Sequence, residues 1–242
     1  MEEIYSITHQ VRNLDVNLYQ RLRTSRLLEF LQEASIAHTE MLGAGREKTL
    51  DKGLLWMVCM QKIEISDMPV YDDIITIESW PGRTMHVLFP RYYRILDEQK
   101  NVKIQGSALW TLVDQNTRKM AFPENYDIHI PGVITGNETD LPKPLKKEEG
   151  SQSSSFTVPF SYCDLNGHMN NSRYCDLTED VTDHIRNGSI LTSLSSEYIS
   201  EARTGDTLSL SWKEDDSSCY MSAKSEKDIF RMQYTYTSIP SR

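Results

Sequence analysis

The sequence predicts an α+β fold in which one unit, a helix with an antiparallel sheet, occurs twice along the chain. Two observations predict it. Each half contains a helix-like segment followed by four strand-like segments, and short groups of residues recur in the same order in both halves. With 242 residues, of which 38% are hydrophobic, the chain can bury a sizeable core. We expect the two sheets to join edge to edge into one broad sheet, with the helices on one side.

The first half begins with a strand-like segment near residues 4–11. A helix follows over residues 25–42, where one buried stripe at helical spacing contains Leu27, Leu28, Leu31, Ala34, Ser35, His38 and Leu42. Strand-like segments then occupy residues 54–65, 73–80, 86–96 and 102–113. One helix before four antiparallel strands predicts a sheet that curls around the helix.

The second half repeats this order in shorter form. It contains a strand over residues 156–161, a helix over 171–186, and strands over 190–200, 207–213, 218–225 and 229–237. Residues 137–155 are poor in apolar side chains and rich in Pro, Gly, Ser and charge, which is typical of a linker. We therefore divide the chain into an N-terminal repeat (1–136), a linker (137–155) and a C-terminal repeat (156–242).

Six identical residues in matching order support a tandem duplication. Asp15-Val16-Asn17 corresponds to Asp164-Leu165-Asn166, Ser25-Arg26 to Ser172-Arg173, and Asp73 and Trp80 to Asp206 and Trp212. Each match is weak alone, but together they run in the same order as the matching elements.

Composition excludes several function classes. The net charge of -9 and the lack of a concentrated basic face disfavour nucleic-acid binding. The longest apolar run, Leu54 to Met60, is far shorter than the roughly 20 residues of a membrane-spanning helix, and no signal peptide is recognisable. We expect a cytoplasmic protein without a membrane span. The four cysteines form no CxxC pair, so neither disulfides nor a metal site is expected.

The two repeats differ at the turn that enters the helix. The first has Asp15, Asn17 and Tyr19, whereas the second has Asp164, Asn166 and His168, followed by Asn170 and Asn171. An extended backbone would place alternate side chains, including Asp164, Asn166, His168 and Asn170, on one side. Gly167 permits a turn, and Asn170 or Asn171 can cap the helix. The alternative is that these residues only form the turn and cap, but capping does not call for an imidazole. Unpaired amides at a helix entrance also suit a carbonyl or anionic oxygen.

These residues resemble a known family. The pattern Asp-x-Asn-x-His-x-Asn-Asn at 164–171, together with Glu-Ala-Arg-Thr-Gly-Asp at 201–206 and Gly-Leu-Leu-Trp-Met-Val at 53–58, is similar to the acyl-ACP thioesterases of plants and especially of bacteria. The resemblance covers nearly the whole chain. It implies a tandem hot-dog fold and a soluble hydrolase that releases free fatty acid from acyl carrier protein and so terminates fatty acid synthesis. It implies no cofactor.

The resemblance also implies the catalytic residues Asp164, Asn166, His168 and Glu201. Glu201 would activate water, His168 and Asn166 would hold the substrate carbonyl or the water, and Asp164 would orient one of them. Plant members often have a cysteine directly after the glutamate, where this chain has Ala202, so Glu201 must supply the base. Cys163 is a poor substitute nucleophile because its neighbour Asp164 should face the other way.

Substrate binding is implied in the N-terminal repeat, between its helix and sheet. Leu55, Trp56, Met57 and Val58 are candidates to line the acyl slot, and Asn170 and Asn171 are further candidates for substrate binding. Ordinary core packing remains the alternative for the four apolar residues. An acidic carrier protein needs a basic docking patch, for which the candidates are Arg21, Arg23, Arg26, Arg91, Arg94, Lys143, Lys146 and Lys147.

Three other functions stay open at this point. A hot-dog thioesterase could act on acyl-CoA, a silent acyl-binding module could hold a ligand without hydrolysis, and a dehydratase could use the same fold. The sequence leaves open the acyl chain length and the oligomeric state, for which a homodimer is one candidate.

Overall fold

The structure, a computed structural model, describes residues 3–237. The first half consists of β1 (Tyr5–Gln10), α1 (Thr24–Met41), β2 (Leu54–Ile65), β3 (Ile74–Pro81), β4 (Leu88–Leu96) and β5 (Val102–Asp114). The second half consists of β6 (Gln152–Thr157), α2 (Arg173–Val181), α3 (Asp183–Arg186), β7 (Ile190–Tyr198), β8 (Thr207–Glu214), β9 (Ser218–Lys224) and β10 (Asp228–Thr237). Short 3-10 turns occupy Asn13–Asp15, Arg46–Lys48, Leu50–Lys52, Pro123–Tyr126 and Phe160–Tyr162.

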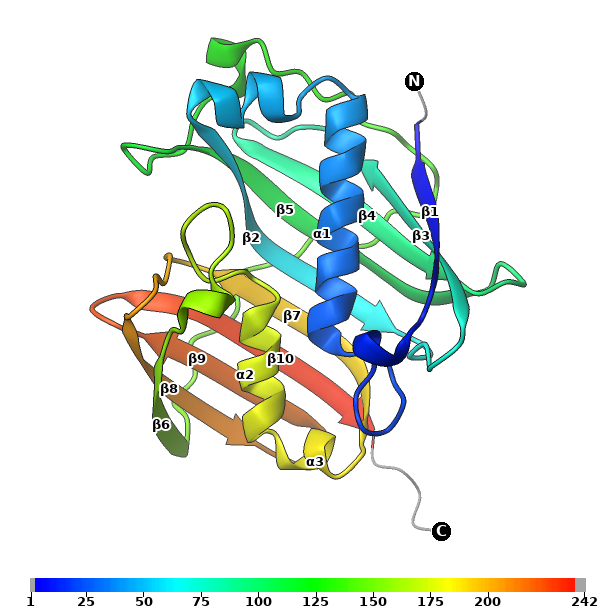
Figure 1. Cartoon of the computed structure of the whole chain (residues 1–242), viewed down its shortest axis with the longest axis vertical. Helices are drawn as coiled ribbons and strands as arrows, with labels where there is room; N and C mark the ends of the chain where they lie inside the picture. The colour runs from blue at the N-terminus through cyan, green and yellow to red at the C-terminus, as the bar shows by residue number, and fades with distance from the viewer. Residues whose placement is uncertain (1–2, 238–242) are drawn as a thin grey trace.

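All ten strands form one antiparallel sheet, in the order β1-β3-β4-β5-β2-β7-β10-β9-β8-β6 (Figure 1). Read inward from either edge, each half places its first strand outermost, then its third, fourth and fifth, and its second strand innermost. The innermost strands β2 and β7 pair with each other, Ile63 opposite Leu194. The predicted duplication and the predicted edge-to-edge junction are thus confirmed.

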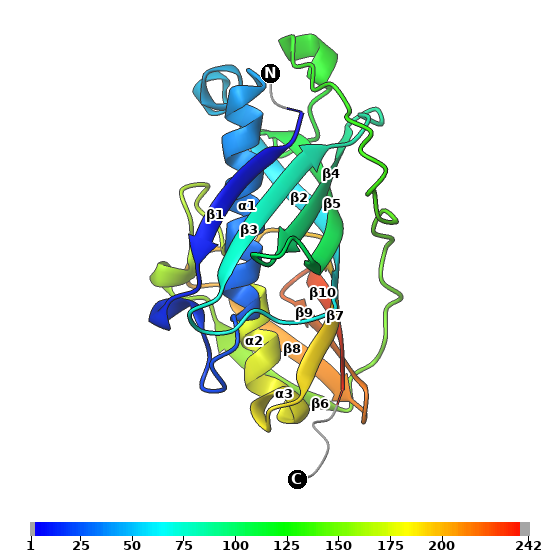
Figure 2. The same cartoon turned by 90° about the vertical axis from the view of Figure 1, so that its right-hand side faces the viewer.

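Both long helices lie on one face of the sheet, as predicted (Figure 2). The expected stripe of α1 is buried from Leu27 to His38, whereas Leu42 lies just beyond the helix as its C-cap and is half-buried. A stripe of apolar side chains at helical spacing has to be removed from water, and the curled sheet of the N-terminal repeat provides the surface.

Two predicted elements have different bounds. The helix expected over residues 171–186 begins at Arg173 and is interrupted at Thr182, whose extended backbone (ψ 103°) separates α2 from α3. The Thr182 hydroxyl donates to Thr178 O at 2.6 Å, and the carboxylate of Glu214 accepts the first two N–H groups of α3. The strand expected over 156–161 is also displaced, because β6 starts at Gln152 and a 3-10 turn begins at Phe160.

The predicted linker lies along the sheet face opposite the helices (Figure 2). Its last residues belong to β6, and several earlier residues form hydrogen bonds with other strands. Ser107 Oγ donates to Asp140 O at 2.7 Å, and Leu145 N donates to the carboxylate of Glu197 at 3.1 Å. This segment is therefore a strap held to both repeats, although its composition is that of a loop.

Candidate functional site

The turn that precedes α2 is compact. Cys163 and Met169 form a β-bridge, Asp164 N donates to His168 O at 3.0 Å, and Gly167 N donates to Asp164 O at 3.0 Å. Gly167 has a φ of 79°, a conformation that glycine adopts without strain. The extended backbone considered for this stretch is thus wrong. Consequently the alternation that would align Asp164, Asn166, His168 and Asn170 on one side does not apply.

Asp164 stabilises this turn. Its carboxylate accepts the backbone N–H of Asn166 at 2.9 Å and the side-chain amide of Asn170 at 3.1 Å. The Asn170 oxygen in turn accepts the N–H of Ser172 at 3.0 Å, and Ser172, rather than Asn170 or Asn171, is the N-cap of α2. Asp164 therefore orients Asn166 through its backbone, and within residues 3–237 it makes no hydrogen bond to the His168 ring.

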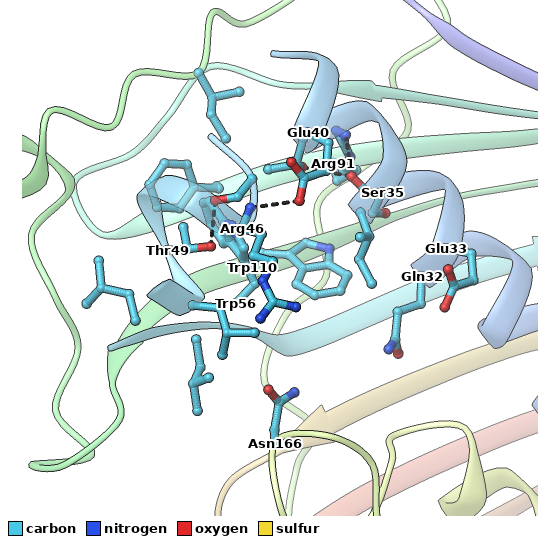
Figure 3. Close-up of a pocket in the computed structure, with 18 of the residues that line it drawn as sticks. Gln32, Glu33, Ser35, Glu40, Arg46, Thr49, Trp56, Arg91, Trp110 and Asn166 are labelled. Carbon is cyan, nitrogen blue, oxygen red and sulfur yellow. Dashed lines mark hydrogen bonds between the residues drawn. The ribbon is translucent and has the colours of Figure 1, made fainter. Parts of the chain in front are cut away.

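A cavity of about 360 Å³ lies between α1, the 3-10 turns after it and the sheet. Asp164, Asn166 and Asn170 line it from the C-terminal repeat, and Leu55 and Trp56 line it from β2. Figure 3 shows Asn166 and Trp56 in this wall. We call it the helix-side cavity. Most of its wall is apolar, which suits a hydrocarbon chain.

A second cavity of about 720 Å³, the junction cavity, contains the remaining predicted site residues, which are Met57, Val58, His168, Asn171 and Glu201. The structure therefore divides the ten residues between two cavities. Consecutive residues line the two cavities at two places, Trp56 and Met57 in β2 and Asn170 and Asn171 in the turn. Within the compact turn, Asp164, Asn166 and Asn170 line one cavity and His168 and Asn171 line the other.

His168 and Glu201 meet in the junction cavity. His168 Nε2 lies 3.5 Å from Glu201 Oε1, and the atom is buried without a hydrogen bond. His168 is 6% exposed, and burial lowers its pKa below 6.5, against the opposing effects of Glu201 and Asp164. The imidazole is therefore neutral at physiological pH, and a small polar molecule could bridge it to the carboxylate.

Two arginines fix the Glu201 carboxylate. Arg118 Nη1 lies 3.1 Å from Oε1, and Arg203 Nη2 lies 3.4 Å from Oε2. Arg203 belongs to the 201–206 motif, whereas nothing in the sequence indicated Arg118. It follows β5 in the N-terminal repeat, 83 positions before Glu201. No local motif marks it, so only the pairing of the repeats brings it to the site.

The backbone amides at the α2 entrance are mostly occupied. Asn170 N donates to Tyr162 O at 2.9 Å, Ser172 N to the Asn170 side chain, and Arg173 N to Asn170 O at 3.0 Å. Among these four consecutive residues of the described chain, the Asn171 N–H alone has no protein acceptor. The expected set of unpaired amides is therefore reduced to one candidate oxyanion donor.

Most of the proposed basic docking residues have other partners. Arg91 is buried, Arg21 and Arg23 donate to backbone carbonyls, and Arg94 pairs with Glu78 at 2.7 Å. Arg26 pairs with Asp15 and Glu29, and Lys147 with Asp228. These pairings argue against a docking patch made of these residues.

Neither a metal cluster nor a membrane helix occurs in the part of the chain that the structure describes. Residues 3–237 contain no group of three His, Cys, Asp or Glu side chains placed to hold a metal ion. No helix in this range is both long and apolar enough to cross a membrane. All four cysteines are unpaired.

The fold is a tandem duplication, and the His168 imidazole faces the Glu201 carboxylate in the junction cavity. The duplicated fold and this polar site together define the class of the protein. The chain belongs to the acyl-ACP thioesterase family. Its residues 2–126 match the model of the acyl-ACP thioesterase N-terminal domain, and residues 145–238 match that of the C-terminal domain.

Curated relatives and solved structures agree with this assignment. A chloroplastic palmitoyl-acyl carrier protein thioesterase of Cuphea hookeriana is 21% identical over 81% of this chain and 51% of its own length. The chain thus spans about half the length of the curated relatives it matches. An acyl-ACP thioesterase from Bacteroides thetaiotaomicron has a TM-score of 0.81 at 19% identity, covering 97% of this chain and 98% of that one. For the 12:0-ACP thioesterase from Umbellularia californica the TM-score is 0.78 at 18% identity, covering 96% and 93%. These structures share the double hot-dog fold predicted from the sequence.

Proposed function

We propose that the protein hydrolyses the thioester between a fatty acyl chain and acyl carrier protein, releasing free fatty acid. The observation that carries the proposal is the buried His168 facing Glu201 at 3.5 Å in the junction cavity, next in sequence to residues that line the apolar helix-side cavity. Family membership supports the substrate class, because the matched relatives are named as acyl carrier protein hydrolases.

In this proposal Glu201 and His168 hold the attacking water. The water donates a proton to the Glu201 carboxylate as its oxygen adds to the thioester carbon. The resulting oxyanion is bound by the free N–H of Asn171 and the side-chain amide of Asn166, donors that typically contribute about 3 to 4 kcal/mol each. When the carbon–sulfur bond breaks, the thiolate takes the proton back from Glu201, and the carboxylate is restored.

The acyl chain would lie in the helix-side cavity and the phosphopantetheine arm in the junction cavity. The thioester would then sit at their boundary, beside the 163–171 turn. Leu55 and Trp56 would contact the chain, whereas Met57 and Val58 would lie next to the reacting group. Asp164 acts as a positioning residue, because its carboxylate holds the backbone of Asn166 and the amide of Asn170.

The test is hydrolysis of dodecanoyl-ACP by Glu201→Gln, which keeps the shape of the side chain and removes the base. We expect kcat/KM to fall by about a hundredfold or more, the usual range for loss of a general base. Glu226→Gln is the matched control, since Glu226 lines the same cavity but is exposed. A Glu201→Gln variant that hydrolyses at the parent rate would contradict the assignment.

Matched acyl-CoA and acyl-ACP substrates test the partner. A much higher kcat/KM on acyl-ACP supports the carrier protein, equal rates favour the acyl-CoA alternative, and tight binding without turnover favours the acyl-binding module. A cytoplasmic location and a homodimer are parts of the proposal that rest on the sequence alone. Cell fractionation and sedimentation measure them.

A further inference from the structure

A buried arginine borders the helix-side cavity. Among residues 3–237, Arg91 is the one arginine or lysine that is buried, with 4% of its surface exposed. It lies on β4 and lines the cavity beside Ser35 and Trp110 (Figure 3). Burial lowers its pKa to about 10, so it remains protonated at neutral pH. Burying a cation costs free energy, and a cavity wall that contacts only hydrocarbon does not require one.

The charge of Arg91 has no carboxylate partner. No carboxylate in the described chain lies within 4.0 Å of its guanidinium, in contrast to Arg94 on the same strand, which pairs with Glu78. Two Arg91 groups have acceptors, with Nε donating to Ser79 Oγ at 3.2 Å and Nη2 to Ser35 O at 3.1 Å. A guanidinium carries five N–H donors, so most of its capacity is left for a ligand.

Further polar groups surround it. Ser35 Oγ and Tyr93 Oη are 2.9 Å apart, and Trp110 Nε1 donates to Tyr93 Oη at 3.2 Å. In Figure 3, Arg91 and Ser35 lie at one end of the cavity and Asn166 lies at the other. Glu40, near Arg91 in that view, is exposed and accepts the N–H of Arg46 at 2.7 Å. The buried polar end is thus distant from the residues of the reacting end.

We propose that Arg91 is a specificity-determining residue that binds an oxygen on the acyl chain, so that the preferred substrates are hydroxy- or oxo-acyl chains substituted far from the thioester. This inference rests on the proposed function. The hydroxyl or carbonyl oxygen accepts a hydrogen bond from the guanidinium, whereas a purely apolar chain would cover these N–H groups and leave them without an acceptor. A purely structural Arg91, which only ties α1 to the sheet through Ser35, would treat all chains alike.

The test compares dodecanoyl-ACP with forms that carry one hydroxy or oxo group at each carbon of the distal half. We expect the parent to favour at least one substituted form in kcat/KM by about tenfold to a hundredfold, the size expected for a hydrogen bond to a charged group. In Arg91→Met, which keeps the length and removes the donors, this preference should disappear or reverse. Arg91→Lys should retain part of it.

Arg94→Met is the matched control and should leave the substrate ratio unchanged, because Arg94 is paired with Glu78 and does not line the cavity. The parent alone can overturn the proposal, by showing no preference for any substituted form, even if Arg91→Met does not fold. An equal loss on all substrates in a folded Arg91→Met variant would also overturn it. A parent that hydrolyses none of the substrates refutes the proposed function, whereas hydrolysis without preference refutes this inference only.

Discussion

Asp15 and Asp164 each lie in the turn before a long helix. The match of these two residues in the sequence is wrong by two positions, because Asn17 N donates to Arg21 O as Asp164 N donates to His168 O, and the bridge Val16–Leu22 corresponds to Cys163–Met169. Asn17 is therefore the structural equivalent of Asp164.

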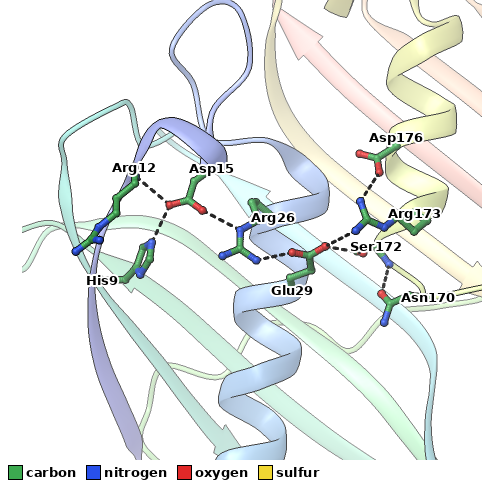
Figure 4. A network of polar contacts seen from close by, with 9 residues as sticks. All are labelled: His9, Arg12, Asp15, Arg26, Glu29, Asn170, Ser172, Arg173 and Asp176. Atoms are coloured by element: carbon green, nitrogen blue, oxygen red, sulfur yellow. Dashed lines mark hydrogen bonds and ion pairs between the residues drawn. The ribbon is translucent and has the colours of Figure 1, made fainter. Parts of the chain in front are cut away.

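Of the two aspartates, only Asp15 is held by cations. Its carboxylate accepts hydrogen bonds from His9 Nε2 at 2.9 Å, Arg26 Nε at 2.8 Å and Arg12 N at 2.9 Å (Figure 4). Asp15 is 3% exposed, and burial by itself would raise its pKa, but these bonds outweigh burial and lower the pKa from 3.8 to about 2. Asp15→Asn is therefore expected to destabilise the fold.

The pKa shift of Asp15 sets the magnitude. Because the carboxyl is more acidic in the folded state, its ionisation stabilises the fold by about 2 kcal/mol at neutral pH. This contribution is complete above pH 3.8 and is lost as the pH falls through about 2. We expect Asp15→Asn to lower the free energy of unfolding by about 2 to 3 kcal/mol at neutral pH, and by less in acid.

Urea unfolding at neutral pH, near pH 5 and near pH 3 measures this difference. Asp164→Asn is the control, since no Arg, Lys or His side chain in residues 3–237 lies within 4.0 Å of the Asp164 carboxylate; its loss should be under about 1 kcal/mol. Equal losses in both variants would refute the reasoning. So would a loss for Asp15→Asn that does not shrink in acid.

Three further outcomes are expected. Burial raises the pKa of Glu179 from 4.5 to about 7, so the stability of the parent falls as the pH rises through that interval. Glu179→Gln should therefore be more stable than the parent by about 2 kcal/mol near pH 8, but not below pH 4.5. Equal urea midpoints for the two proteins at both pH values would contradict this. The lowered pKa of His168 predicts that kcat/KM declines only below pH 6.5. Arg118→Met should move this acidic decline to higher pH, because the charge of Arg118 contributes to the lowered pKa of His168. A decline at the same pH in both proteins would count against this role of Arg118. Trp56→Ala should enlarge the helix-side cavity and raise the ratio of hexadecanoyl- to dodecanoyl-ACP hydrolysis several-fold, whereas an unchanged ratio would show that Trp56 does not limit the chain.

The equivalent turns before the two long helices have different roles. In the N-terminal repeat Asp15 joins a polar network that runs through Arg26 to Glu29, and Glu29 Oε1 then contacts Ser172 and Arg173 of the other repeat (Figure 4). One copy of the turn thus stabilises the junction of the repeats, and the equivalent turn at Asp164 lines the candidate site.

The sequence by itself determined the elements and their repetition. Apolar periodicity located both long helices and all ten strands, because a side chain's burial depends on which face of its own element it occupies. Local pattern selected His168 and the family resemblance added Glu201, and these two residues are close together in the structure. The exact bounds of α2 and β6 were missed, since the interruption at Thr182 and the pairing of β6 depend on contacts with distant residues such as Glu214.

Tertiary structure alone decided how the site is assembled. Arg118 reaches Glu201 only because the innermost strands of the two repeats pair, and the folded chain divides the predicted residues between two cavities. Arg91 looked like a surface charge in the sequence but is enclosed beneath α1. These features depend on distances between residues far apart in the chain, which periodicity and spacing do not encode.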